Sequence, residues 1–318
     1  MKSFITFVAA AALVLVLAAC GQPAPAPDPD PDPEPQSIAA IAADAGDFGT
    51  LLSILPEDLA AALSDDEAGP FTVFAPTDDA FAAIAEVLPT LSDEQVRDVL
   101  ELHVIGASVS STEAIEAVSA RSLGSELLFF IVDGDDLLVD GVALVTNPDI
   151  EASNGVIHVI DAVLLPKGTI ADVAVDFTTA DPPQFTTLVT AIQAADATVF
   201  DTLADVEAGP FTVFAPTDAA FEAIPEQDLQ DLLDDPAALT NVLLYHVTGA
   251  GALVASQVVS LVSQGPEEVE MLNGDDVTVA LDGDSVTVNT ATVEITDVLT
   301  ANGVIHVIDA VLLPPSLD

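Results

Sequence analysis

The sequence is very poor in positive charge. Four of its 318 residues are Lys or Arg, against 53 Asp or Glu, so the formal net charge is -49 at pH 7. Such a chain is repelled by polyanions, which argues against nucleic acid as a partner and against electrostatic binding to an anionic membrane surface. Two explanations of the acidity stay open: adaptation to a saline or divalent-rich exterior, and the acidic surface of an ordinary secreted protein.

Cysteine is nearly absent as well. Cys20 is the single cysteine, which excludes an internal disulfide and any further cysteine nucleophile. It follows Lys2 and an apolar run at 4–17, the order of a secretory signal, and this run is shorter than the about 20 apolar residues of a membrane-spanning helix. Residues 17–21 (LAACG) resemble a bacterial lipobox, in which the cysteine becomes the lipid-modified first residue of the mature protein. We expect residues 1–20 to be a lipoprotein signal peptide and Cys20 the lipidation site, with an uncleaved anchor or plain secretion as alternatives.

A proline-rich segment follows the cysteine. Proline occupies every second position from Pro23 to Pro35, interleaved with Ala, Asp and Glu. This composition favours extended polyproline II and excludes helix or central strand, so residues 21–36 are expected to form a semi-rigid stalk. The expected location is therefore lipid-anchored at the cell envelope, at the outer membrane or cell surface, with a periplasmic or extracellular ectodomain.

The rest of the chain contains a duplication. Residues 69–84 return almost unchanged as 209–224, and residues 154–166 are identical to 302–314. Because the two copies are displaced by the length of a domain, the repeat unit is domain-sized rather than a short solenoid repeat. We expect one domain at 37–168 and a second at 169–318.

Helix signals dominate the first half of each copy. Ser92 and Gln95 have the spacing of a capping box, and Asp235 precedes Pro236 as an N-cap precedes a proline at the first helical position. Apolar residues at helical spacing then lead to a histidine in both copies. A further helix is expected after Thr77 or Asp78, with an apolar stripe at 81, 84 and 88.

Strand signals dominate the second half. The closing runs 156–165 and 304–313 are apolar on both faces except for one His and one Asp, as in a buried central strand. Asp-Gly pairs separate shorter runs, as in hairpins. The architecture predicted is α+β, with helices first and the sheet after. The other expected strands are 71–75, 129–132, 137–139, 142–145, 277–281 and 285–289.

These blocks resemble the fasciclin domain family. The second copy has a Thr-Val-Phe-Ala-Pro-Thr-Asp-x-Ala-Phe block at 212–221, the pair Tyr245-His246, and Asn-Gly-Val-Ile-His-Val-Ile-Asp at 302–309; the first copy has Leu102 in place of the tyrosine. The resemblance covers about residues 37–318. It implies two tandem fasciclin-like domains, each with a helical N-terminal half packed on a β-sandwich or wedge sheet, used in cell adhesion and matrix contacts.

All four histidines of the chain lie in the repeated blocks, and two roles are weighed for them. In one, each histidine forms hydrogen bonds within the core. In the other, which the resemblance implies for the Tyr-His pair and the residues around the closing histidine, they contact an adhesion partner. The candidate binding residues are Tyr245, His246, His306, His103, His158, Asp309 and Asp161.

Catalytic signals are missing from the sequence. It has no Gly-x-Ser-x-Gly elbow and no His-Glu-x-x-His motif. On a strand, His158 and Asp161 point to opposite faces, which argues against a His-Asp dyad. We therefore expect no enzyme, no catalytic residue, no cofactor and no metal site.

Three functions are compatible with these features. The first is a cell-surface lipoprotein that adheres to an extracellular-matrix or cell-surface protein or polysaccharide, with avidity from two domains. The second is an envelope protein that binds a carbohydrate or another small ligand. The third is a structural envelope component in which calcium bridges acidic faces of neighbouring molecules.

The lipid anchor can be tested directly. Cells fed a radiolabelled fatty acid should incorporate label into the wild-type chain and not into Cys20→Ser, because that thiol is the acceptor. Equal labelling of both chains, or no labelling of either, would exclude lipidation at Cys20.

Overall fold

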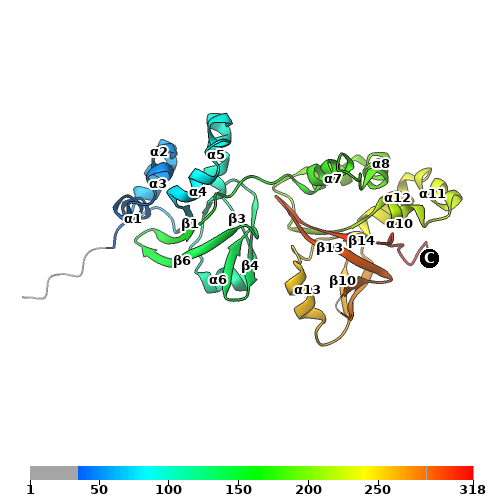
Figure 1. Ribbon diagram of the computed structural model, residues 1–318. Helices are drawn as coiled ribbons and strands as arrows, with labels where there is room; N and C mark the ends of the chain where they lie inside the picture. Colours follow the sequence, from blue (N-terminus) through cyan, green and yellow to red (C-terminus); the bar gives the residue numbers. More distant parts are fainter. Residues whose placement is uncertain (1–34, 284, 318) are drawn as a thin grey trace, which may run out of the picture. The chain divides into compact units, whose positions relative to one another are not determined.

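The computed structural model describes residues 35–283 and 285–317. The predicted signal peptide, Cys20 and nearly all of the predicted stalk lie outside these residues. The described chain repeats one order of elements twice (Figure 1), and we call the copies module 1 and module 2.

Module 1 begins with three helices and ends with a run of strands. Its elements are α1 (Ile38–Ala45), α2 (Gly49–Ile54), α3 (Glu57–Ser64), β1 (Phe71–Pro76), α4 (Asp78–Ala83), the 3₁₀ helix η1 (Leu88–Thr90), α5 (Asp93–Leu102), β2 (Val104–Ile105), α6 (Ser111–Ala117), β3 (Ser119–Arg121), β4 (Leu127–Asp133), β5 (Asp136–Val139), β6 (Ala143–Ala152) and β7 (Gly155–Ile160).

Module 2 follows the same plan with one more α-helix in place of η1. Its elements are α7 (Ile170–Thr178), α8 (Thr186–Ala194), α9 (Ala197–Ala204), β8 (Phe211–Pro216), α10 (Asp218–Glu222), α11 (Glu226–Leu233), α12 (Pro236–Leu244), β9 (Val247–Thr248), α13 (Ala255–Val262), β10 (Glu267–Glu270), β11 (Asp276–Asp282), β12 (Ser285–Val288), β13 (Ala291–Thr300) and β14 (Gly303–Ile308).

Each module contains one sheet, and the described residues form seven strands in each. The order is β2-β1-β7-β6-β5-β4-β3 in module 1 and β10-β11-β12-β13-β14-β8-β9 in module 2. Neighbouring strands are antiparallel except for β1 with β7 and β8 with β14, which pair in parallel. The closing runs are therefore central strands, as the sequence predicted.

A glycine opens each closing strand because the backbone of the first strand lies against it. A Cβ added to Gly155 would lie 1.9 Å from the carbonyl oxygen of Phe71. In module 2, a Cβ on Gly303 would lie 2.2 Å from the oxygen of Phe211. Any larger residue would therefore push the parallel pair apart.

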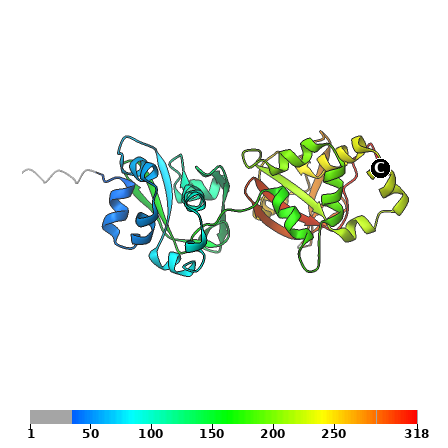
Figure 2. The same cartoon turned by 90° about the horizontal axis from the view of Figure 1, so that it is seen from above.

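Apolar cores lie on both faces of each sheet. In module 1, helices α1 to α5 lie on one side of the sheet and α6 on the other, and module 2 has the same layers, as Figures 1 and 2 show. The core under the helices includes Ile38, Leu63 and Ile157 in module 1. The core on the other face includes Phe74 and Phe130. The central strands are therefore buried between two layers of side chains. The predicted architecture, α+β with a helical half packed on a sheet, is confirmed.

Local signals located most helix starts correctly. Ser92 and Gln95 form both bonds of a capping box, and Asp235 accepts hydrogen bonds from the amides of Ala237 and Ala238. Thr77 caps α4, which ends at Ala83. The predicted stripe through position 88 is too long, because the chain after Ile84 turns into η1.

The long strands β6 and β13 were only partly expected. The predicted run 142–145 covers the start of β6, and no strand was predicted in the region of β13 or β10. Both long strands shift register against the closing strand, which interrupts the alternation of apolar residues by which strands are recognised. The closing strands themselves are shorter than predicted, since β7 ends at Ile160 and β14 at Ile308.

Among the described residues, we find no helix with both the length and the apolar character needed to cross a bilayer.

Candidate functional site

The Tyr-His pair lies inside module 2. Tyr245 is 2% exposed and His246 is 3% exposed, at the C-terminal end of α12. The hydroxyl of Tyr245 donates to the carbonyl oxygen of Asp276 at 2.9 Å and accepts from the side-chain amide of Asn289 at 3.1 Å. The tyrosine therefore joins α12 to strand β11 and to the residue that follows β12, and its hydroxyl already has partners.

Both helix-end histidines bridge two parts of the backbone. Nδ1 of His246 lies 2.7 Å from the carbonyl oxygen of Val242, and Nε2 lies 2.9 Å from the amide nitrogen of Leu312. His103 forms the same pair of bonds in module 1, to the oxygen of Val99 and the amide of Leu164. Because an amide can only donate, Nε2 accepts and the proton of the neutral ring is on Nδ1.

Burial keeps these two rings neutral. It lowers the pKa of His246 from 6.5 to about 4, against the opposing effect of the hydrogen bond to Val242. His103 is lowered to a pKa of about 4 for the same reason, with Val99 as the opposing partner. Near neutral pH, neither ring can bind an anionic partner through a positive charge.

The closing-strand histidines use the opposite tautomer. Nδ1 of His306 lies 3.3 Å from the amide nitrogen of Asp297, and Nε2 lies 2.7 Å from the carbonyl oxygen of Leu253. His158 has equivalent partners, the amide of Asp149 and the oxygen of Val109. Here the amide donates to Nδ1, so Nε2 carries the proton and donates to the carbonyl.

The ring of His158 connects β6 to the loop before α6, and the ring of His306 connects β13 to the loop before α13. Each stacks on a phenylalanine of the first strand, with ring centroids 5.3 Å apart for Phe74 and His158 and 5.8 Å apart for Phe214 and His306. Burial lowers the pKa of His306, while the Leu253 carbonyl and the Asp297 carboxylate raise it, and burial dominates.

The two aspartates of the closing block differ from the histidines because they are exposed. A carboxylate oxygen of Asp161 accepts from the amide of Leu144 at 2.8 Å, and Asp309 accepts from Thr292 at 2.6 Å. The aspartates come directly after β7 and β14, so they do not face the histidines. Of the predicted binding residues, these two are the ones that a partner could touch directly.

Asparagine is the residue type that the sequence reasoning did not single out. The side-chain oxygen of Asn302 accepts from the amide of Ile170 at 2.9 Å, and its NH₂ group donates to the carbonyl oxygens of Leu203 and Asp205, both at 3.0 Å. It is fully buried. Asn154 forms the same three bonds in module 1. The sequence does carry a signal for these asparagines, because each is the first residue of the block that is identical in the two copies.

Asp149 and Asp297 were missed for a different reason. Each has a positive φ, 57° and 59° respectively, within the irregular part of the long strand. Asp149 accepts from the amide and hydroxyl of Ser111 at the start of α6, and Asp297 accepts from the amide of Ala255 at the start of α13. They lie outside the identical blocks, so only an alignment of the two copies would have paired them.

Polar residues of the first repeated block are also internal ties. The hydroxyl of Thr212 donates to the oxygen of Gly251 at 2.7 Å and accepts from the amide of Leu253 at 2.8 Å. Asp218 accepts from the amides of Thr186 and Thr187, which begin α8. Module 1 repeats these bonds through Thr72 and Asp78.

Module 1 compensates for the missing tyrosine. Leu102 takes that position. Asp140 stands where module 2 has Asn289, and the side chains of Asp140 and Asn289 each accept a hydrogen bond from a backbone amide of the neighbouring strand. Asp140 forms an ion pair with Lys167 at 2.5 Å, and both side chains are largely buried. One of the few cations of the chain therefore replaces a tyrosine hydroxyl.

A metal centre finds no support in the described residues, where no three His, Cys, Asp or Glu side chains converge closely enough to hold an ion. The repeated polar groups instead satisfy one another or the backbone.

The sequence signature of the fasciclin domain matches this chain at residues 46–166 and again at 183–314. The protein belongs to the fasciclin domain family. The two matches correspond to the two modules, so the family resemblance read from the blocks is confirmed as tandem fasciclin domains.

Relatives come from both animals and bacteria. The transforming growth factor-beta-induced protein ig-h3 of Oryctolagus cuniculus is 31% identical over 287 residues, which are 88% of this chain and 40% of that protein. Protein sll1483 of Synechocystis is 44% identical over 137 residues, 41% of this chain and 68% of that protein. The chain thus spans less than half the length of the animal relative.

A solved structure was also found. The FAS1 domain pair from the insect cell adhesion molecule fasciclin I aligns with 86% of this chain and 99% of its own, with a TM-score of 0.42 and 21% identity. Of these proteins, fasciclin I is described as an insect cell adhesion molecule.

The depressed histidine pKa values predict an acid-sensitive stability. Above pH 6.5 the ring of His246 is neutral in both folded and unfolded chains; between pH 6.5 and 4 only the unfolded chain binds a proton, so stability falls as pH falls. The loss is about 3 kcal/mol for this histidine at pH 4. His246→Gln, which cannot titrate, should lose correspondingly less between pH 7 and pH 4.

Tyr245 makes the measurement specific to module 2, since it is the single tyrosine and the chain has no tryptophan. Urea unfolding, followed by Tyr245 fluorescence at several pH values, gives the change of the unfolding free energy with pH for wild type and for His246→Gln. His103→Gln, in module 1, is the matched control and should leave the Tyr245 transition unchanged. Identical pH slopes for wild type and His246→Gln would contradict the prediction.

Proposed function

We propose that this protein is a cell-envelope lipoprotein that adheres to an extracellular-matrix or cell-surface protein or polysaccharide through its two fasciclin domains. The observation that carries the proposal is the duplication of a complete adhesion-associated domain in one chain. Two weak sites on one chain gain affinity by avidity without any new contact. A lipid on Cys20 and a stiff proline-rich stalk would present both domains away from the membrane.

The contact surface is proposed to lie on exposed residues rather than on the Tyr-His pair. Tyr245, His246 and His306 are each at most 3% exposed, whereas Asp161 and Asp309 are exposed. The buried residues support binding indirectly, because they hold the strand and loop positions that an outer surface requires. A mutation in them would then reduce adhesion by unfolding the domain.

The proposed partner surface is basic or calcium-bridged. The chain has a formal net charge of -49, and carboxylates dominate its exposed polar residues. An acidic partner, such as an anionic polysaccharide, would therefore bind only through a divalent cation that neutralises both faces. A calcium-bridged assembly of envelope molecules remains the alternative that the same charge favours.

Attachment of cells tests the proposal. We expect cells with the wild-type chain to attach and clump, cells with a deletion of residues 37–318 to lose attachment, and cells with residues 169–318 deleted to attach more weakly than wild type. The same assay without calcium distinguishes attachment that needs calcium bridges from attachment by direct contact with the partner. Unchanged attachment after the deletion of residues 37–318, at matched surface levels, would exclude the adhesive function.

Two substitutions distinguish a residue that stabilises the domain from a residue that contacts the adhesion partner. His306→Ala should lower the melting temperature while the protein that remains folded binds normally, because its ring faces the module interior. Asp309→Asn changes an exposed charge next to the same strand and should change melting less. Normal melting of His306→Ala with lost adhesion would show that the histidine is itself the contact.

A further inference from the structure

An amine and a carboxyl group are in contact inside module 1. Nζ of Lys167 lies 2.5 Å from Oδ2 of Asp140, and the two side chains are only 15% and 7% exposed. Lys167 comes after β7, and Asp140 lies in the turn between β5 and β6. Lys2 is the one other lysine of the chain, so a primary amine in the protein interior is confined to this point.

The carboxyl group of Asp140 is held in one orientation. The backbone amide of Phe129 donates to Oδ1 at 2.9 Å, and the amide of Asp140 donates to the carbonyl oxygen of Phe129 at 2.8 Å. Oδ2 therefore faces the amine. An amide fixed on Oδ1 also stabilises the negative charge that develops on this oxygen when a nucleophile attacks Cγ.

Lys167 is positioned by two contacts of its own. A carboxylate oxygen of Glu126 accepts from the backbone amide of Lys167 at 3.0 Å, and Nζ lies 5.8 Å from the ring centroid of Phe129. Burial raises the pKa of Glu126, although the hydrogen bond and the charge of Lys167 oppose this shift. The surroundings therefore disfavour charge, which makes it easier for an ion pair to become an amine and a carboxylic acid.

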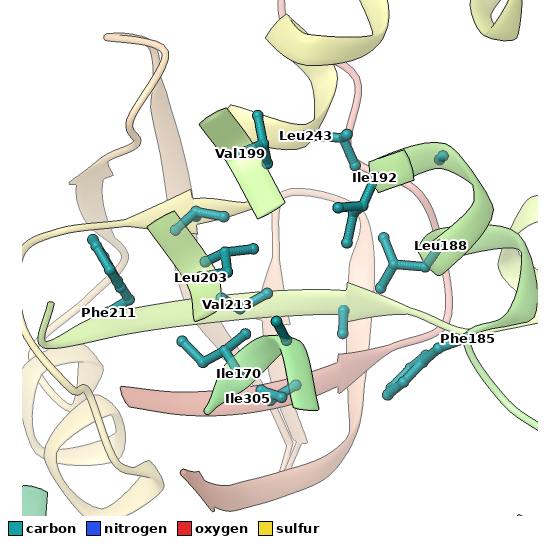
Figure 3. Close-up of a cluster of buried hydrophobic side chains, with 14 of the residues drawn as sticks. Ile170, Phe185, Leu188, Ile192, Val199, Leu203, Phe211, Val213, Leu243 and Ile305 are labelled. Atoms are coloured by element: carbon teal, nitrogen blue, oxygen red, sulfur yellow. The ribbon is translucent and has the colours of Figure 1, made fainter. Parts of the chain in front are cut away.

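Module 2 shows that the fold does not need this pair. The identical block that closes both modules ends one residue before Lys167, and Pro315 takes the next position in module 2. Asn289 stands in place of the aspartate and bonds to the hydroxyl of Tyr245. Module 2 still has a complete apolar core beneath its helices, as Figure 3 shows. A neutral contact is thus sufficient for the fold, and the amine and carboxyl group are specific to module 1.

We propose that Lys167 and Asp140 form an intramolecular isopeptide bond. Two protons pass from the ammonium group to Oδ2, Nζ attacks Cγ, and Oδ2 leaves as water, so that a C–N bond replaces a C–O bond. Oδ1 becomes the carbonyl oxygen of the new amide and keeps its hydrogen bond from Phe129. Nothing is oxidised or reduced, and no further reactant is needed. Reactants held in contact replace a bimolecular encounter, which lowers the barrier, and burial protects the product from hydrolysis.

The bond closes a covalent loop that contains β6 and β7. Lys167 is also the point at which the chain leaves module 1 for module 2. Tension applied from module 2 would therefore pass through the bond and bypass the two strands. This mechanical use rests on the adhesive function proposed above, whereas formation of the bond does not depend on it.

Tryptic digestion of the denatured whole chain, followed by mass spectrometry, tests the bond. Trypsin has cleavage sites after Arg121 and Lys167 and none beyond them. We expect residues 122–318 to remain one fragment, about 18 Da below the mass calculated from the sequence, because the lysine side chain is an amide and one water is lost. Fragments 122–167 and 168–318 at their full calculated masses would overturn the proposal, whether or not the protein is adhesive.

Lys167→Arg is the matched control. It keeps the positive charge beside Asp140 but replaces the amine that would be acylated, so cleavage after position 167 and full masses are expected. Asp140 precedes Gly141, and an Asp-Gly pair can also lose water by closing on its own backbone. A fragment 122–167 that is about 18 Da light, in wild type or in Lys167→Arg, would assign the lost water to this ring closure and refute the isopeptide bond. The wild-type digest decides the question alone if Lys167→Arg does not fold.

Discussion

Each module is held together by the parallel pairing of its first and closing strands and by the asparagine next to the closing strand. Asn302 bonds the start of α7 and the last turn of α9 to this strand pair, and Asn154 does the same for α1 and α3. The helical layer and the sheet therefore meet at one side chain in each module. Parallel pairing across such a long stretch of chain is costly to form, so this tie decides whether the module closes.

The repeated polar residues share this structural role. The histidines, Tyr245 and the threonines bond mainly to backbone groups of distant segments, which satisfies buried donors and acceptors that would otherwise cost stability. Identity between the two copies therefore reflects the shared interior. The exposed acidic surface, which differs between copies, is where a partner would be distinguished.

The sequence was informative where the signal is local. Caps at Ser92 and Asp235 and the apolar closing strands depend on neighbours within a few residues, so their types were predicted correctly. The partners of the histidines depend on the fold, since Leu312 lies far from His246 along the chain. The later part of β6 and all of β13 were missed because Asp149 and Asp297 adopt positive φ where pattern recognition expects alternation.

The most direct test of the account is the free energy of unfolding of Asn302→Ala, followed by Tyr245 fluorescence. We predict a loss of about 3 kcal/mol, because the amide of Ile170 and the two carbonyl oxygens would be left buried without a partner. Asn154→Ala, in the other module, should leave this transition unchanged. A loss below about 0.5 kcal/mol would show that the buried ties do not hold the module together and would contradict the account.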